Sequence, residues 1–186
     1  LGDVYKRQLL HGSFATTGIG HGTDKALVAG LLGMRPDDIR IPTSFELAKK
    51  NGMEFSFSTV TLKDAHPNTA VLRLTGQHGR KIEVQAASIG GGRILIAKLD
   101  GIDVNFSAEK PTLIVHNVDQ PGHVAQVTTM LAEKQVNIAT LQLYRDKRGG
   151  YAVMVIETDQ EVPEESVTWL EQLDGIIKVT YINVEE

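Results

Sequence analysis

A histidine and an aspartate lie beside a glycine-rich loop near the start of the chain. Residues 18–22 read Gly-Ile-Gly-His-Gly, and Thr23 and Asp24 follow them. An imidazole titrates close to neutral pH, so His21 can accept a proton, while Asp24 can orient the imidazole or cap a helix. A second interpretation stays open: the glycines serve a tight turn, and Asp24 only complements the helix dipole.

The order of strand, glycine loop and helix around His21 predicts an anion cradle built from backbone N–H groups. The loop is not a Walker A motif, because no Gly-Lys-Ser/Thr ends it. The dinucleotide fingerprint fails too, because its third glycine falls on Thr23. Thr23 is instead expected to be the N-cap of a helix that stops at Gly33.

Three consecutive glycines, Gly90, Gly91 and Gly92, follow a predicted strand. Such a run indicates either a bulged strand or a backbone that must approach another group closely. The sequence favours neither interpretation.

A second strand-to-helix turn lies at residues 119–122, which read Asp-Gln-Pro-Gly. A β-branched run precedes it, and apolar residues with a helical period follow it. Pro121 suits the first position of a helix because its φ is already helical. Unpaired N–H groups near Pro121 and Gly122 then favour a bound carboxylate.

The elements around that turn predict a ferredoxin-like βαββαβ unit. We expect them in the order strand 112–116, helix 121–134, strand 136–144, hairpin connection 145–150, strand 151–156, helix from 163, and strand 176–184. Asp119 and Asn137 are then able to meet an ammonium or amide group of a ligand at this unit.

The first half predicts a separate α/β domain, so the fold class is α+β with two domains. Its elements are expected as strand 9–14, helix 23–33, helix 43–50, strand 53–58, hairpin 71–87 and hairpin 94–104. We place the first domain at residues 9–106, a linker at 107–110 and the second domain at 111–186. Residues 1–8 show no clear pattern and are expected to be a leader or a truncation junction, outside the fold.

The composition excludes several function classes. A net charge of -4 and a pI near 5.9 argue against nucleic-acid and anionic-membrane partners. No apolar run approaches the roughly 20 residues of a membrane helix, so the cytoplasm is the expected location. The chain of 186 residues has no cysteine. It therefore offers no thiol nucleophile and no thiolate for an iron–sulfur cluster, and we predict no metal site within it.

The second half resembles the ACT domain, an amino-acid-sensing module of metabolic enzymes. The resemblance lies in Val-Asp-Gln-Pro-Gly-His-Val at residues 118–124, followed by Val-Asn-Ile at 136–138. It implies a site for L-serine or another small amino acid, and an ACT-mediated homodimer contact. The allosteric ligand residues that it implies are Asp119, Pro121, Gly122, His123, Asn137 and Ile138.

The first half is similar to the allosteric-substrate-binding (ASB) domain of iron–sulfur L-serine dehydratases. The matching phrases lie at residues 11–14, 18–24, 66–69 and 88–92. Joined to an ACT domain, the chain resembles the beta subunit of these enzymes, which convert L-serine to pyruvate and ammonia. One departure is that the family's Gly-Pro-Ser-Ser-Ser-His-Thr phrase is missing.

The resemblance implies roles for particular residues and for a partner. His21 and Asp24 become catalytic candidates, with His21 as base for the Cα proton. Thr23 and Gly90, Gly91 and Gly92 become substrate-binding candidates. A [4Fe–4S] cluster would act as Lewis acid on the substrate hydroxyl, held by a cysteine-bearing alpha subunit and not by this chain.

A function of a different class stays open. The same two-domain architecture resembles the regulatory half of D-3-phosphoglycerate dehydrogenases, where serine is a feedback signal. His21 would then do no chemistry, and the chain would be a non-catalytic serine-sensing module. The Gly-His-Gly-Thr-Asp phrase at residues 20–24 favours the dehydratase.

Overall fold

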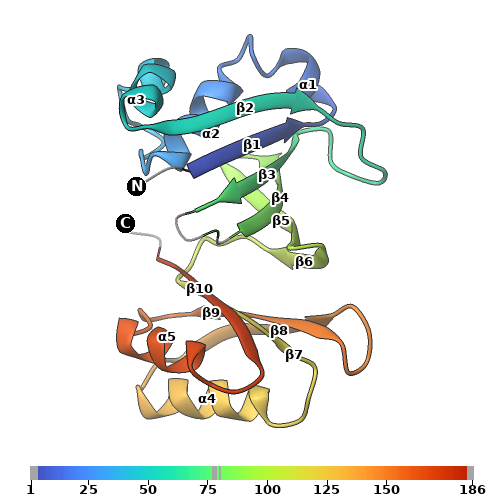
Figure 1. The fold of residues 1–186 in the computed structure, drawn as a ribbon, viewed down its shortest axis with the longest axis vertical. Helices are drawn as coiled ribbons and strands as arrows, with labels where there is room; N and C mark the ends of the chain where they lie inside the picture. The colour runs from blue at the N-terminus through green and yellow to red at the C-terminus, as the bar shows by residue number, and fades with distance from the viewer. Residues whose placement is uncertain (1–3, 77–78, 80, 184–186) are drawn as a thin grey trace. The chain divides into compact units, whose positions relative to one another are not determined.

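The computed structural model describes residues 4–76, 79 and 81–183. Contacts divide the chain into two compact units, Leu1–Gly101 and Ile102–Glu186. Each contains a sheet and a few helices, so the predicted α+β class is confirmed (Figure 1). The domain boundary predicted at residues 107–110 stays a prediction, as does a leader or truncation junction at residues 1–8. The placement of residues 1–8 outside the fold is wrong for residues 4–8, which belong to a strand.

The first unit is built on an antiparallel sheet with one parallel pair. Its elements are β1 (Val4–Leu10), α1 (Ser13–Thr17), α2 (Thr23–Leu31), the 3₁₀ turn η1 (Ile41–Thr43), α3 (Ser44–Lys50), β2 (Met53–Thr59), β3 (Thr69–Thr75), β4 (Lys81–Gly90) and β5 (Arg93–Leu99). Its strands lie in the order β2-β1-β3-β4-β5, and the chain continues into β6 (Ile102–Phe106). β1 runs parallel to β2 and antiparallel to β3, so it is an interior strand of the sheet.

The prediction for the first strand was wrong. The strand occupies Val4–Leu10 rather than residues 9–14, so part of the segment left out of the fold lies inside the sheet. The hydropathy pattern hid it, because the inward positions include Lys6 and Gln8, which are 7% and 0% exposed. The Lys6 ammonium donates to the Leu31 carbonyl at 3.1 Å, and burial lowers the pKa of this lysine.

The start of α2 differs from its predicted position. The N-cap of α2 is Gly22, at φ 73°, and Thr23 is the first helical residue. Thr43 is the N-cap of α3, which ends at Lys50 as predicted. Its hydroxyl makes no capping hydrogen bond, because it donates to the Arg40 carbonyl at 2.9 Å in a local turn.

Apolar residues of α2, α3 and β2 form the core that holds the first unit's helices to its sheet. Val28, Ala48 and Met53 are buried there. Phe55 and Phe57, which alternate with polar residues along β2, pack against them. This packing fixes the start of α2, where the His21 loop joins it.

The second unit has the predicted βαββαβ order. Its elements are β7 (Thr112–Val118), α4 (His123–Glu133), β8 (Ile138–Arg145), β9 (Tyr151–Thr158), α5 (Glu164–Glu171) and β10 (Ile176–Ile182). The strands pair in the order β10-β7-β9-β8, all antiparallel. This is the ferredoxin-like arrangement, and both helices lie along one face of the sheet (Figure 1).

The second unit's core lies between that sheet face and the two helices. β7, β9 and β10 contribute Leu113, Val115, Met154, Ile156 and Val179, while α4 and α5 contribute Val127, Met130, Leu131 and Leu170. Each such side chain stabilises the fold by about 1.5–3 kcal/mol when fully buried. The sheet therefore holds the β7–α4 turn and the start of β8 on a rigid base.

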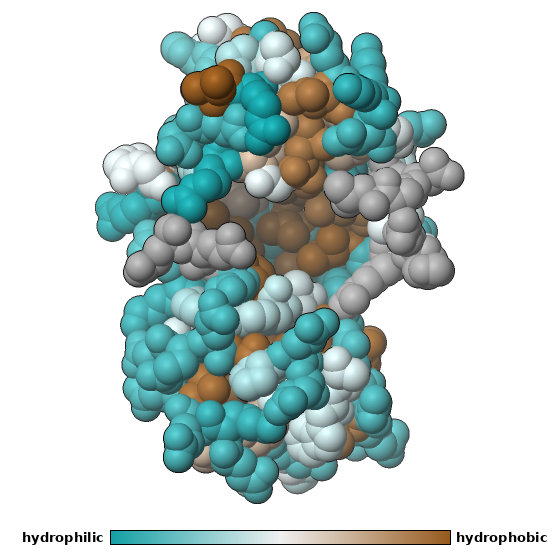
Figure 2. Space-filling model, turned by 90° about the vertical axis from the view of Figure 1, so that its left-hand side faces the viewer, coloured by the Kyte–Doolittle hydropathy of each residue, from teal (hydrophilic) through white to brown (hydrophobic). Residues whose placement is uncertain are grey.

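The face shown in Figure 2 is mostly hydrophilic, with apolar patches in both units. Isolated apolar side chains at the surface include Ile19 and Ile39, which are 74% and 93% exposed. Among the residues that the structure describes, no helix is long and apolar enough to cross a membrane.

Candidate functional site

The loop that carries His21 is closed by its own backbone. The N–H groups of His21, Gly22 and Thr23 donate to the carbonyls of Thr17, Ile19 and Gly18, at 3.2, 3.1 and 2.8 Å. These three donors are therefore not available to an anion. The predicted cradle is wrong at these three positions, because the loop satisfies its backbone internally.

The side chains of His21 and Asp24 differ in their surroundings. His21 is exposed, so a substrate can reach its imidazole from outside. Asp24 accepts a hydrogen bond from the Lys25 N–H at 2.9 Å, which satisfies one donor of the first helical turn. Within residues 4–183 as described, no hydrogen bond joins this carboxylate to the His21 ring. Asp24 is thus bonded within the first helical turn, while the N-cap Gly22 has no side chain to cap the helix.

Two histidine-bearing turns of the first unit lie against one another. The N–H groups of His11 and Ser13 donate to the carbonyls of Thr69 and Pro67, at 3.0 and 2.8 Å. Gly12 has φ 57°, and a Cβ on it would stand 2.5 Å from the Pro67 oxygen. Only glycine fits this approach.

His11 and His66, on these two turns, have similarly fixed rings. The N–H of Leu62 points at His11 Nδ1, and the N–H of Asn68 at His66 Nδ1, both at 3.1 Å. His66 Nδ1 therefore acts as acceptor, and its neutral ring carries the proton on Nε2. His11 Nδ1 also lies 3.3 Å from the Val60 carbonyl, so this nitrogen is held between a donor and an acceptor. Sequence reasoning did not pair these turns, because backbone groups join them and no side-chain pattern reports such a contact.

Gly90, Gly91 and Gly92 form the hairpin turn between β4 and β5. Their φ angles are 89°, 63° and 75°, which favour glycine. A Cβ added at any of them would meet no heavy atom of the described chain within 4 Å. Turn geometry therefore explains the three glycines, and no close approach to another segment is involved.

The β7–α4 turn presents backbone donors at the start of α4. The helix begins at His123, two residues later than predicted, and its N-cap Gly122 has φ 106°. The first internal bond of α4 runs from the Gln126 N–H to the Gly122 carbonyl at 2.9 Å. The N–H groups of residues 123–125 have no partner among the described residues, which is the arrangement that favours a carboxylate at a helix start.

Asp119 is already engaged inside the second unit. Its carboxylate accepts hydrogen bonds from the Gly149 N–H at 2.9 Å and from Arg145 at 3.1 Å. These two bonds, the Gly149 N–H above all, lower the pKa of Asp119. The side chain thus fastens the β7–α4 turn to the β8–β9 connection.

His123 is buried, and its ring lies against Gly175 at the start of β10. Its Nδ1 is 3.2 Å from the Gln126 side-chain oxygen. A Cβ on Gly175 would stand 2.6 Å from the other ring nitrogen, which has no hydrogen-bond partner in the described part of the chain. The imidazole therefore fastens the first residue of α4 to the α5–β10 turn.

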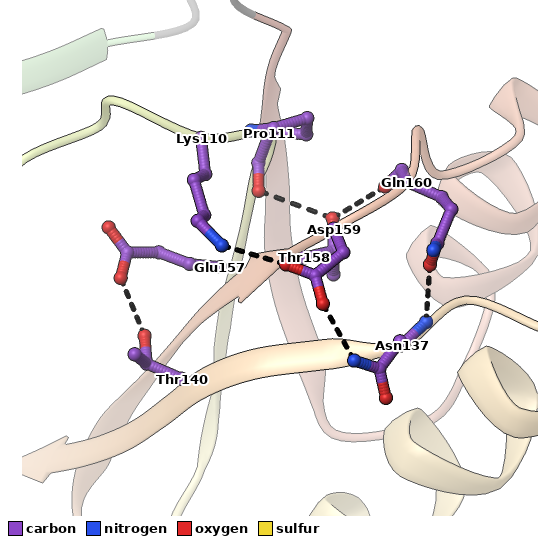
Figure 3. A network of polar contacts seen from close by, with 8 residues as sticks. All are labelled: Lys110, Pro111, Asn137, Thr140, Glu157, Thr158, Asp159 and Gln160. Atoms are coloured by element: carbon purple, nitrogen blue, oxygen red, sulfur yellow. Dashed lines mark hydrogen bonds and ion pairs between the residues drawn. The ribbon is translucent and has the colours of Figure 1, made fainter.

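Asn137 belongs to a polar network at the start of β8 (Figure 3). Its side-chain N–H₂ donates to one Asp159 oxygen at 2.7 Å, and the Lys110 ammonium donates to the other at 2.7 Å. The Asn137 backbone N–H donates to Gln160 at 2.7 Å. Lys110 and then Asn137 lower the pKa of Asp159. Ile138, next in sequence, packs against the apolar core.

The allosteric candidates fall at two ends of the second sheet. Asp119 bonds to Gly149, just before β9 begins at Tyr151, while Asn137 bonds to Asp159, just after β9 ends at Thr158. The seven residue steps along β9 span about 23 Å at roughly 3.3 Å per residue. One amino acid therefore cannot contact both Asp119 and Asn137 of the same copy, and their assignment as ligand residues stays a prediction.

The described residues offer few side chains that could bind a metal ion together. The sequence has no cysteine, and the described residues contain no group of three His, Asp or Glu side chains that could hold a metal ion. The residues present therefore do not fit an iron–sulfur cluster, which proteins hold mainly by thiolates.

Two family models match the chain. The serine dehydratase beta chain model matches residues 6–54, and the ACT domain model matches residues 111–175. The second match lies within the ferredoxin-like unit and includes the β7–α4 turn and the start of β8. The first includes His21, Thr23 and Asp24.

Curated relatives resemble the chain along most of its length. The L-serine dehydratase beta chain of Peptoniphilus asaccharolyticus is 36% identical over 94% of this chain and 79% of its own. The probable L-serine dehydratase beta chain of Bacillus subtilis is 36% identical over 92% of this chain and 78% of its own. D-3-phosphoglycerate dehydrogenase of Methanocaldococcus jannaschii is 29% identical over 61% of this chain and 22% of its own.

Proposed function

Because the chain belongs to the L-serine dehydratase beta chain family and carries an ACT domain, we propose that it acts with an alpha subunit to deaminate L-serine to pyruvate and ammonia. The observation that carries this proposal is the joined match, at 36% identity, across both halves of the chain. The ACT domain gives the enzyme its response to an amino acid.

The iron–sulfur chemistry belongs to the alpha subunit. This chain has no thiolate to offer, so the [4Fe–4S] cluster is held by cysteines of the partner. The contribution of this chain is to bind and orient L-serine and to move a proton.

His21 is the base that takes the Cα proton of L-serine. Its exposure and its place in a glycine loop support this role, since a substrate held by the partner can reach the ring. Thr23 and residues 90–92 contribute to the substrate wall, and Asp24 keeps the helix start in place through its bond to Lys25. A general base of this kind accelerates a reaction by about 10²- to 10⁴-fold.

The activity is tested by co-expression with the alpha chain and an anaerobic assay of serine-dependent pyruvate formation. His21→Ala is expected to lower kcat by about 10²-fold or more, because the proton acceptor is lost. Lys25→Gln, an exposed change one turn away, is the matched control and keeps full turnover. Loss of activity in H21A with normal assembly supports the base, while a rate within about threefold of the parent rejects it.

The alternative is a non-catalytic serine-sensing module, favoured by the likeness to D-3-phosphoglycerate dehydrogenase. Under this function the chain binds serine through its ACT half and forms no pyruvate with any alpha chain. Serine binding without turnover, in the co-expressed complex with its cluster intact, would establish the alternative and overturn the dehydratase.

The ACT ligand site is completed by a second copy of the chain. Asp119 and Asn137 lie at the two ends of β9, but β8 is an edge strand. Antiparallel pairing of two β8 edges across a two-fold axis sets the Ile138 end of one strand beside the Arg145 end of the other. Since Arg145 bonds to Asp119, the Asn137 of one copy then meets the β7–α4 turn of the other.

Such a shared site suits a small amino acid. The open N–H groups at the start of α4 receive the carboxylate, while Asn137 meets the ammonium or the side chain. Asp119 holds the turn in place rather than contacting the ligand first, because its carboxylate is bonded to Gly149 and Arg145.

A further inference from the structure

A groove of about 640 Å³ runs between α4 and α5 on the outer side of the second unit. Its volume falls within the range of roughly 300–1,000 Å³ that is usual for small-molecule sites. The groove exists because small side chains, Ala125 on α4 and Ser166 on α5, line it where larger ones would fill the space. Its lining includes Gln126, whose side-chain oxygen is 3.2 Å from His123 Nδ1, so one end of the groove adjoins the start of α4.

The groove has an apolar floor and an aromatic wall. Met130 lines it and is 6% exposed, while Trp169 lines it and is 43% exposed. An indole that is half open to solvent beside an apolar floor can pack against a flat or aliphatic group. A ligand with an apolar body therefore gains contact area here.

A buried hydroxyl lies in the same groove. Ser166 lines it and is 2% exposed, and its Oγ has no hydrogen-bond partner among the residues that the structure describes. Buried polar atoms in folded proteins nearly always have a partner. A ligand that brings a hydrogen-bonding group to Ser166 would supply one.

The charges around the groove favour a cation. Lys134 and Glu165, at one part of the lining, form an ion pair and neutralise one another. Glu133 also lines the groove and makes no ion pair within the described residues, so one negative charge remains. The face of Trp169 attracts cations as well, through the ring quadrupole.

We propose that the groove between α4 and α5 is a second ligand site, which binds a small organic ammonium with an apolar body. The ammonium lies between the Glu133 carboxylate and the Trp169 ring, with a hydrogen bond to Ser166. The apolar body lies over Met130 and beside Ala125. The ACT unit thereby acquires a site for an amine beside its amino-acid site.

The test uses the intrinsic fluorescence of the purified full-length chain. Trp169 is the sole tryptophan in the sequence, so its emission reports on this groove. The probes are 2-phenylethylamine, the neutral 2-phenylethanol and the anionic 3-phenylpropanoate. A saturable change is expected for the amine, with affinity about three- to tenfold above that for the alcohol, and none for the acid.

Two variants and a matched control locate the binding. Glu133→Gln is expected to weaken the amine about three- to tenfold, since it removes the charge and keeps the shape. Ala125→Leu fills the groove and abolishes the fluorescence change. Glu164→Gln, on α5 but outside the lining, is the control and leaves the affinity unchanged.

Each result decides the proposal once circular dichroism shows that the variants fold alike. Charge-selective binding that E133Q weakens and E164Q does not supports the site. Equal affinity for amine and alcohol, or equal losses in E133Q and E164Q, would overturn the ammonium assignment. Absence of a saturable change with the parent chain would overturn the site itself.

Discussion

The side-chain amide of Gln8 is buried in the first sheet without a hydrogen bond to any described residue. It is 0% exposed, and neither its Oε1 nor its Nε2 has a hydrogen-bond partner in the described part of the chain. A buried polar group without a partner costs about 1–3 kcal/mol. Gln8 is therefore a destabilising residue at the centre of β1, between strands β2 and β3.

Gln8→Leu is expected to raise the free energy of unfolding by about 1–3 kcal/mol, because leucine has a similar volume and no polar atoms. Urea denaturation followed by circular dichroism measures the shift in midpoint. Arg7→Leu is the matched control, since Arg7 is the adjacent, exposed residue of the same strand. An unchanged or lower midpoint in Q8L would mean that the amide has a partner such as bound water.

At the level of elements, the α5–β10 turn and the start of α4 are locked together. Gly175 has φ 79°, the Val118 N–H donates to its carbonyl at 2.9 Å, and the buried His123 ring lies where a Cβ would be. The start of α4 and the start of β10 are therefore in direct contact.

Gly175→Ala is expected to destabilise the second unit by about 1–3 kcal/mol, because its Cβ would overlap the His123 ring. Gly149→Ala is the matched control: its φ is 71°, but a Cβ there meets nothing within 4 Å. The difference in stability loss between the two variants gives the cost of the clash, because both variants carry the cost of a positive φ. Thermal unfolding of both, and of the G175A/H123A double variant, gives the coupling. Equal losses of stability in G175A and G149A would contradict the contact between a Cβ at position 175 and the His123 ring.

At the scale of the whole molecule, the edge strand β8 leaves apolar side chains uncovered. Leu141 and Leu143 pair with Ile156 and Met154 of the core, yet they are 36% and 47% exposed. The two helices cover the other strands and leave this strip open. An edge strand with an exposed apolar strip is a surface that a second copy can cover.

Leu143→Asp is expected to convert dimers to monomers and to lower the affinity for L-serine about tenfold or more, because the shared site is split. Analytical ultracentrifugation and isothermal titration calorimetry measure the two effects. Ile177→Asp, at a 56% exposed position of the opposite edge strand β10, is the control for added charge. A monomeric L143D that binds serine normally would contradict a site made from two copies.

The sequence by itself determined the architecture of the second unit. Its strands and helices have long apolar patterns with a clear period, and such patterns report burial through local spacing alone. The same holds for β2, where Met53, Phe55 and Phe57 alternate with polar residues. The motifs around His21 and at residues 119–122 also marked where chemistry and ligand binding were to be sought.

Only the tertiary structure decided which segment forms β1 and which backbone N–H groups are available to a ligand. Lys6 and Gln8 are buried by pairing with distant strands, so no local pattern could place β1. The N–H groups around His21 are bonded within the loop, whereas those at the start of α4 are open. Asp119 and Asn137 match one motif but lie at opposite ends of β9. Hydrogen-bond partners and separations depend on how the chain folds back on itself, and spacing along the sequence does not contain them.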